Sequence, residues 1–142
     1  STLRDKSFFI PKLCVAAINA HKYNFKTAFG NLDVKREWNW CDDQCELLIK
    51  FLNKEPQDFI ISHGKCLSAK KMLKFAFDYF NLDYKKYIFK DKKFLRPVDI
   101  KIKQSKYRES LIKNEIDKKN FTHGNKLINL MIKNYLKLNL LH

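Results

Sequence analysis

The spacing of apolar residues near the two ends of the chain most constrains its fold. Both stretches repeat apolar side chains three and four positions apart, which places them on one face of a helix. In the first stretch they are Ile10, Leu13, Cys14, Ala17 and Ile18, and in the second Ile128, Met131, Ile132 and Tyr135. We therefore expect a helix near each end. The first can be capped by Ser7, with Pro11 in its opening turn, where a missing N–H is tolerated.

Two further helices are predicted between these ends. Asp42 or Asp43 can start one of them, with an apolar face made of Cys45, Leu48, Ile49 and Leu52. Ser68 is a candidate N-cap for the other, whose apolar residues are Met72, Phe75, Ala76 and Tyr79. Residues 105–112 are a weaker candidate for a short helix.

Short extended segments are expected at residues 26–29, 59–61 and 84–89, and Arg96-Pro97 favours a turn or an extended element. The chain lacks the repeated strand, glycine loop and helix that build a nucleotide-binding sheet. We therefore predict one helix-rich α+β domain over residues 1–142, with about five helices, two or three short strands and no Rossmann sheet.

The net charge of +14 points first toward nucleic acid or an anionic membrane surface. Arginine, however, supplies only four of the 29 basic residues, whereas phosphate-reading and base-reading surfaces usually exploit the guanidinium fork. A solvated lysine-rich surface is therefore the preferred interpretation, and a nucleic-acid binder with salt-dependent affinity is kept as an alternative.

No apolar run approaches the roughly 20 residues that span a bilayer. The chain also opens without a signal-peptide pattern, so a cytoplasmic protein away from membranes is expected. The missing initiator Met hints at an excerpt of something longer.

The four cysteines form no CxxC pair and have no secretory context, which favours reduced thiols. Cys41 and Cys45 could share a helix face, but no nearby histidine completes a tetrahedral zinc site, so we predict no metal. Cys14 and Cys45 are interpreted as core residues. The histidines at positions 21, 63 and 123 have no nucleophile or carboxylate at motif spacing and are interpreted as structural or surface residues.

The nonapeptide Gly30–Trp38 (GNLDVKREW) is an unusual loop. Glycine and asparagine permit tight backbone geometry, and two cations and an indole follow within a few residues. Such a loop suits an anion that carries a flat ring, with Arg36 offering a bidentate phosphate contact. A plain surface turn with one Trp covering the core is equally open on chemistry alone. Trp40 could be a core aromatic or part of a pocket wall.

This nonapeptide resembles the GNLDAKRDW segment of the GDP-mannose 4,6-dehydratases, which belong to the extended short-chain dehydrogenase/reductase group. Residues 1–13 resemble that family's SPRRGETFVTRKI, residues 55–61 its EPEDFVI, and residues 94–99 its FFRPAEV. Several motifs in one order are more specific than any single one. The resemblance implies the C-terminal, substrate-binding half of such an enzyme.

By that resemblance, four residues are candidates to bind the guanosine diphosphate of GDP-mannose: Lys12, Arg36, Arg96 and Asp99. Cations neutralise the diphosphate, and a carboxylate can accept from ribose hydroxyls, although the family places Glu where this chain has Asp99. Arg4 matches the second Arg of a family loop that contacts NADP and helps subunits pair. Leu3 and Asp5 depart from the pattern of that loop.

The resemblance also predicts what this stretch does not carry. The reaction begins with hydride transfer to NADP, for which the family uses a Gly-rich loop, a Tyr-x-x-x-Lys pair, a Thr and a Glu. None of the three glycines lies in such a loop, and Tyr23 precedes Lys26 by one position too few. We expect no catalysis by these residues alone, with NADP held by a missing Rossmann half and with that half or homo-oligomer subunits as partners. A degenerate, non-catalytic remnant that serves as an interaction module is the alternative.

Overall fold

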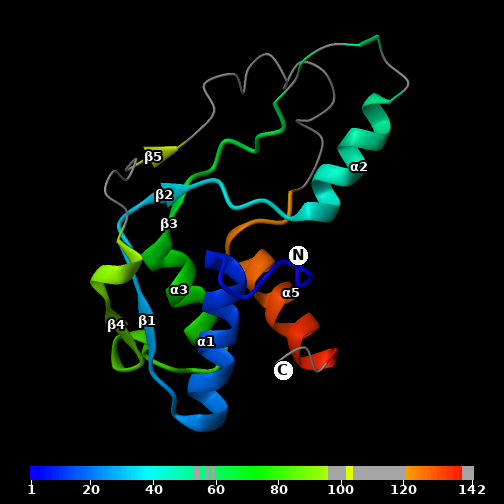
Figure 1. Ribbon diagram of the computed structural model, residues 1–142. Helices are drawn as coiled ribbons and strands as arrows, with labels where there is room; N and C mark the ends of the chain where they lie inside the picture. Colours follow the sequence, from blue (N-terminus) through cyan, green and yellow to red (C-terminus); the bar gives the residue numbers. More distant parts are fainter. Residues whose placement is uncertain (53–54, 57, 59, 96–101, 104–120, 139–142) are drawn as a thin grey trace.

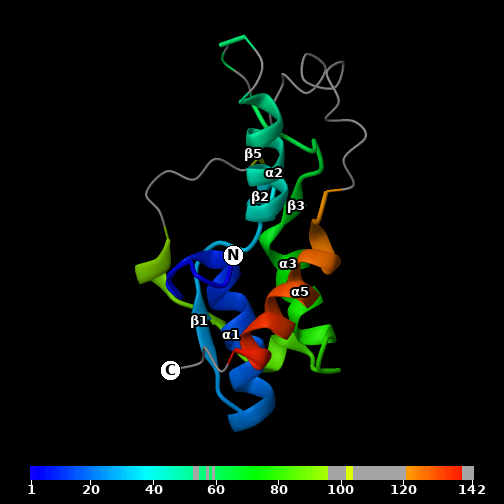
Figure 2. The same cartoon turned by 90° about the vertical axis from the view of Figure 1, so that its right-hand side faces the viewer.

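The computed structural model describes residues 1–52, 55–56, 58, 60–95, 102–103 and 121–138. Three helices form its centre: α1 (Phe9–Tyr23), α3 (Ala69–Asp78) and α5 (Gly124–Lys137). Each of the three contacts the other two, and both views show them packed together (Figures 1 and 2). Their facing side chains are fully buried, among them Leu13, Phe77 and Tyr135. The apolar stripes predicted for the two terminal helices are confirmed, because all nine of their residues except Ile10 are buried.

The strands are short and form two separate sheets. Strand β1 (Thr27–Phe29) pairs in parallel with β4 (Ile88–Lys90), with Thr27 opposite Ile88. In the second sheet, β2 (Lys35–Arg36) lies between β3 (Leu67–Ser68) and β5 (Ile102–Lys103), antiparallel to the first and parallel to the second. Two 3₁₀ helices, η1 (Tyr84–Lys86) and η2 (Lys92–Phe94), flank β4.

The predicted helix-rich α+β class is confirmed, and the described residues form no large sheet. The described residues contain four α-helices and five strands of two or three residues. The extra strands are two-residue pairings, too short to leave a period in the sequence. The helix predicted at 105–112 lies outside the described residues. In the segment predicted as a strand at 59–61, Ile60 and Ile61 belong to no strand, and within 84–89 the first half is η1 rather than extended.

Helix capping agrees with prediction in one helix and differs in another. The Ser68 hydroxyl accepts the backbone N–H of Lys71 and caps α3, as expected. Ser7, by contrast, does not cap α1, which begins at Phe9 after Phe8. The Ser7 backbone N–H donates to the Asp5 carboxylate at 2.7 Å, so Ser7 belongs to the preceding turn instead.

Helix α2 (Cys41–Phe51) lies apart from the three central helices (Figure 1). It begins one residue before the predicted start, but its orientation differs from the prediction. Leu48, Ile49 and Leu52 are 47%, 65% and 79% exposed, and Cys45 is exposed as well. Leu47 is buried instead, against Phe121 in a small second core. The interpretation of Cys45 as a core residue is therefore wrong, whereas Cys14 is buried as expected.

Candidate functional site

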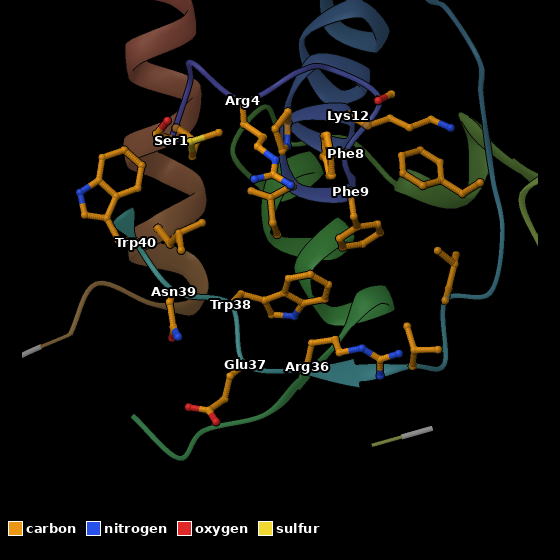
Figure 3. Close-up of a pocket in the computed structure, with 18 of the residues that line it drawn as sticks. Ser1, Arg4, Phe8, Phe9, Lys12, Arg36, Glu37, Trp38, Asn39 and Trp40 are labelled. Atoms are coloured by element: carbon orange, nitrogen blue, oxygen red, sulfur yellow. The ribbon is translucent and has the colours of Figure 1, made fainter. Parts of the chain in front are cut away.

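A pocket of about 1270 Å³ opens between the start of α1, the loop that follows β1, and the first half of α5. Its wall contains three cations, Arg4, Lys12 and Arg36, which come from three separate segments of the chain. Aromatic rings fill much of the remaining wall: Phe8, Phe9, Phe29, Trp38, Trp40 and Phe94. In Figure 3, Phe9 and Trp38 lie between Arg4 and Arg36. The pocket thus combines positive charge with flat apolar surfaces.

Arg36 occupies the second residue of β2. The backbone on both sides of β2 is held, because Arg36 pairs with Leu67 in β3 and with Lys103 in β5. Its guanidinium Nη1 donates to the Lys35 carbonyl oxygen at 2.8 Å. The sheet therefore fixes the point from which the Arg36 side chain enters the pocket.

Lys12 lies on α1 with its ammonium group among aromatic rings. Its Nζ is 3.6 Å from the centroid of the Phe94 ring and 4.8 Å from that of Phe29. Burial lowers the pKa of Lys12, the charge of Lys93 adds to that effect, and Asp91 opposes it. An anion in the pocket would oppose the effects of burial and of Lys93 and would stabilise the charged form of Lys12.

Arg4 lies at the rim. Its Cζ atom is 3.7 Å from the centroid of the Phe8 ring, and Arg4 itself is exposed. A guanidinium this close to an aromatic face is attracted to the ring. Arg4 is therefore held at the pocket while remaining accessible to a ligand.

The aromatic wall is built around Trp38. Its indole stacks on the Phe9 ring, with centroids 4.9 Å apart, and its Nε1–H donates to the Leu67 carbonyl oxygen at 3.2 Å. Both interactions hold the indole ring in place, so Trp38 is a structural part of the pocket wall. Trp40 is 8% exposed and also lines the pocket, so it is both a core aromatic and part of the wall.

Gly30 serves the site by allowing a close approach. A Cβ added at this position would lie 2.2 Å from the Phe94 carbonyl oxygen and 2.8 Å from its carbonyl carbon. Only glycine admits the η2 backbone at that distance. This close approach allows Phe94 to lie in the pocket wall. Two of the predicted ligands, Arg96 and Asp99, follow in the sequence and lie outside the described residues.

A carboxylate network behind the loop was not predicted from the sequence. Glu37 accepts the Ser62 hydroxyl, with oxygen–oxygen distances of 2.7 and 2.8 Å, and the Gly64 N–H at 2.7 Å. In Figure 3, Glu37 points away from Arg4 and Trp38. The network ties the loop to residues 62–64. Two features of the sequence belong to this network: Gly64 and the acidic residue directly after Arg36. In the structure Gly64 has a φ of +70°, which favours glycine.

His63 and His123 adjoin this network. Their rings stack with centroids 5.0 Å apart, and His63 Nδ1 lies 3.7 Å from Glu37 Oε1. That same Nδ1 accepts the Lys65 N–H at 3.1 Å. Burial is the main cause that lowers the pKa of both histidines. His21 stacks on Phe80 instead. All three therefore have structural contacts, as expected.

Within the described ranges, no three His, Cys, Asp or Glu side chains are grouped so that they could hold a metal ion. The same part of the chain has no helix with the length and apolar character needed to cross a membrane.

Comparison with known proteins gives consistent matches. A family model described as GDP-mannose 4,6 dehydratase matches residues 1–125. GDP-mannose 4,6 dehydratases 1 and 2 of Arabidopsis thaliana are each 25% identical over 95 residues, which cover 65% of this chain and 26% of theirs. A GDP-L-fucose synthetase from Naegleria fowleri has a similar structure, with a TM-score of 0.69 at 17% identity over 92% of this chain and 39% of that one. The chain thus spans about a quarter of the length of these curated relatives.

Proposed function

Since this chain belongs to the GDP-mannose 4,6-dehydratase family, we propose that its pocket binds the guanosine diphosphate part of GDP-mannose. The whole activity that we propose is the NADP-dependent conversion of GDP-mannose to GDP-4-dehydro-6-deoxymannose. These 142 residues would contribute the sugar-nucleotide-binding part and would not catalyse the reaction alone. We also propose that the protein is cytoplasmic.

The observation that carries the proposal is the convergence of Arg4, Lys12 and Arg36 on one aromatic-lined pocket. Arg4 and Arg36 are 32 positions apart in the sequence, and the fold brings them to the same pocket. A diphosphate carries the charge that these cations would neutralise, and Arg offers two parallel donors to phosphate oxygens. The aromatic walls suit a flat base.

Lys12 and Arg36 would have different tasks. Burial lowers the pKa of the Lys12 ammonium, so a nearby anion would stabilise its charged form and Lys12 would add affinity for the phosphates. The backbone of Arg36 is held by its pairing with β3 and β5, so its guanidinium group would orient the phosphates. Arg96 and Asp99 remain proposed ligands by resemblance to the family, and Asp99 would accept from the ribose.

NADP would accept the hydride in the proposed reaction. In this chain only Arg4 is a candidate to touch it. Arg4 suits a phosphate of the cofactor, because it is exposed at the rim and its guanidinium lies over Phe8. We propose that the remainder of the enzyme binds the rest of the cofactor.

The exposed apolar face of α2, formed by Leu48, Ile49 and Leu52, supports a role within a larger assembly. Apolar side chains grouped on one exposed helix face are typical of a surface that another protein part covers. A Rossmann half or a second subunit is the proposed cover. The same face supports the second candidate function, an interaction module whose pocket no longer binds a ligand.

Calorimetry with GDP separates these two candidates. We expect the folded chain to bind GDP with a dissociation constant at or below the millimolar range, and Arg36→Ala to weaken binding about 10- to 100-fold, since a charge-assisted hydrogen bond contributes roughly 1.5–3 kcal/mol. Guanosine without phosphates should bind far more weakly.

Lys35→Ala is the matched control, because Lys35 is the neighbouring cation on β2 but does not line the pocket. It should change the GDP affinity less than threefold at about 0.15 M salt, because an exposed cation outside the pocket wall is partly screened and makes no direct contact with the ligand. A folded chain that gives no GDP heat would favour the interaction module. Equal losses for both variants would show that only net charge matters, as would be expected for a nonspecific polyanion binder.

A further inference from the structure

The first two turns of α2 carry two exposed thiols that the proposed function does not use. Cys41 and Cys45 are four positions apart, and their Sγ atoms lie 3.9 Å from each other. The other two cysteines differ in environment, since Cys14 is fully buried and Cys66 is partly buried. Neither Cys41 nor Cys45 lines the pocket.

A direct disulfide does not suit this pair. Residues at this spacing on a helix have Cβ atoms about 5–6 Å apart, whereas a disulfide requires about 3.5–4.5 Å between Cβ atoms and about 2.05 Å between sulfurs. Closing the bond would therefore unwind the first turn of α2. A single atom bridging the two sulfurs would leave the helix as it is.

The sulfur separation matches such a bridge. A zinc–thiolate bond of about 2.3 Å at the tetrahedral angle places two sulfurs about 3.8 Å apart, close to the 3.9 Å between Cys41 and Cys45. The sequence predicted no metal here because no histidine completes a four-ligand site; we propose instead that Cys41 and Cys45 form a two-ligand surface site for one soft, thiophilic d¹⁰ cation, bound as a bis-thiolate. The two remaining coordination positions face solvent and are open to external ligands.

The binding step is an exchange of protons for metal and involves no oxidation. Each S–H bond breaks, each sulfur keeps its electron pair and bonds to the cation, and two protons leave to solvent for every divalent ion bound. Binding is therefore expected to strengthen as the pH rises.

Cadmium alone is the probe, because its thiolate complexes absorb in the ultraviolet and report sulfur coordination directly. On the reduced full chain we expect one Cd²⁺ per chain and two protons released per ion. Cys41→Ser and Cys45→Ser should each weaken binding at least tenfold, and Cys66→Ser should leave it unchanged. Both α2 cysteines are exposed, so these variants should fold, which circular dichroism checks.

Several outcomes would overturn the site. Cadmium absorption that survives Cys41→Ser, or that is lost with Cys66→Ser, would place the sulfur ligands elsewhere. One ion per two chains, with dimerisation seen by light scattering, would replace an intrachain site by a shared one. Rapid formation of a Cys41–Cys45 disulfide with glutathione disulfide would show that the helix yields and would remove the geometric premise.

Discussion

Asp43 joins the first turn of α2 to the segment just before α5. Its Oδ2 atom accepts the backbone N–H of Thr122 at 2.6 Å, across 79 positions of sequence, and both residues are buried. A hydrogen bond to an ionised acceptor contributes roughly 1.5–3 kcal/mol, and its loss would leave the Thr122 N–H buried without this acceptor. We therefore predict that Asp43→Ala strongly destabilises the fold.

Asp42 provides the control, because it precedes Asp43 on the same first turn and is exposed. Both substitutions remove a negative charge from the helix N-terminus, at about 0.3–1 kcal/mol each. Only Asp43→Ala also removes the bond to Thr122. Its free energy of unfolding should therefore fall by about 1.5–3 kcal/mol more than that of Asp42→Ala, a difference of about 6–12 °C in Tm at about 4 °C per kcal/mol.

Urea unfolding gives the two free energies, and hydrogen exchange at the Thr122 amide gives the local effect. The exchange rate of that amide should rise in Asp43→Ala and stay unchanged in Asp42→Ala. Asp43→Asn keeps an acceptor oxygen and should recover part of the loss. Equal destabilisation by Asp42→Ala and Asp43→Ala would refute the reasoning, since it would leave only the helix-terminus effect.

Three further predictions concern the site. Gly30→Ala should lower the free energy of unfolding by about 1–3 kcal/mol in urea titrations, because its Cβ would overlap the Phe94 carbonyl; a rescue by Phe94→Leu would contradict a clash with the backbone. Glu37→Ala should cost about 2–4 kcal/mol in the same assay, since the buried Ser62 hydroxyl and the partly buried Gly64 N–H lose their carboxylate acceptor. Burial lowers the pKa of His63 and His123 in the fold, so the unfolded chain takes up protons first on acidification. Stability should therefore be full above about pH 7 and fall as the pH drops below about 6.5, the ordinary histidine pKa; urea unfolding at several pH values checks this, and His63→Phe should flatten the slope.

Sequence periodicity predicted correctly the helices whose apolar face packs against the common core. The α5 stripe is buried as its spacing required, and Ser68 caps α3 as its position indicated. The α2 face formed by Leu48, Ile49 and Leu52 was predicted to be buried and is exposed. Periodicity identifies an apolar face but does not tell what covers it.

The candidate site residues were predicted only through family motifs, and their role as ligands stays a prediction. No local pattern relates Arg4, Lys12 and Arg36, because the pocket that unites them arises from tertiary packing. Gly30 was expected to permit a tight turn, whereas the structure assigns it a close backbone approach to Phe94. The Glu37 network escaped prediction since its donors lie 25 and 27 positions away.

The pairing of β2 on both edges has a consequence for how this pocket can change over evolutionary time. Backbone partners in β3 and β5 hold residue 36 in place, and those partners do not depend on which side chain the residue carries. Replacing Arg36 would alter the chemistry presented to a ligand while the main chain stays in register. Position 36 is therefore a place where a lineage, or an engineer, can exchange specificity at little cost to folding.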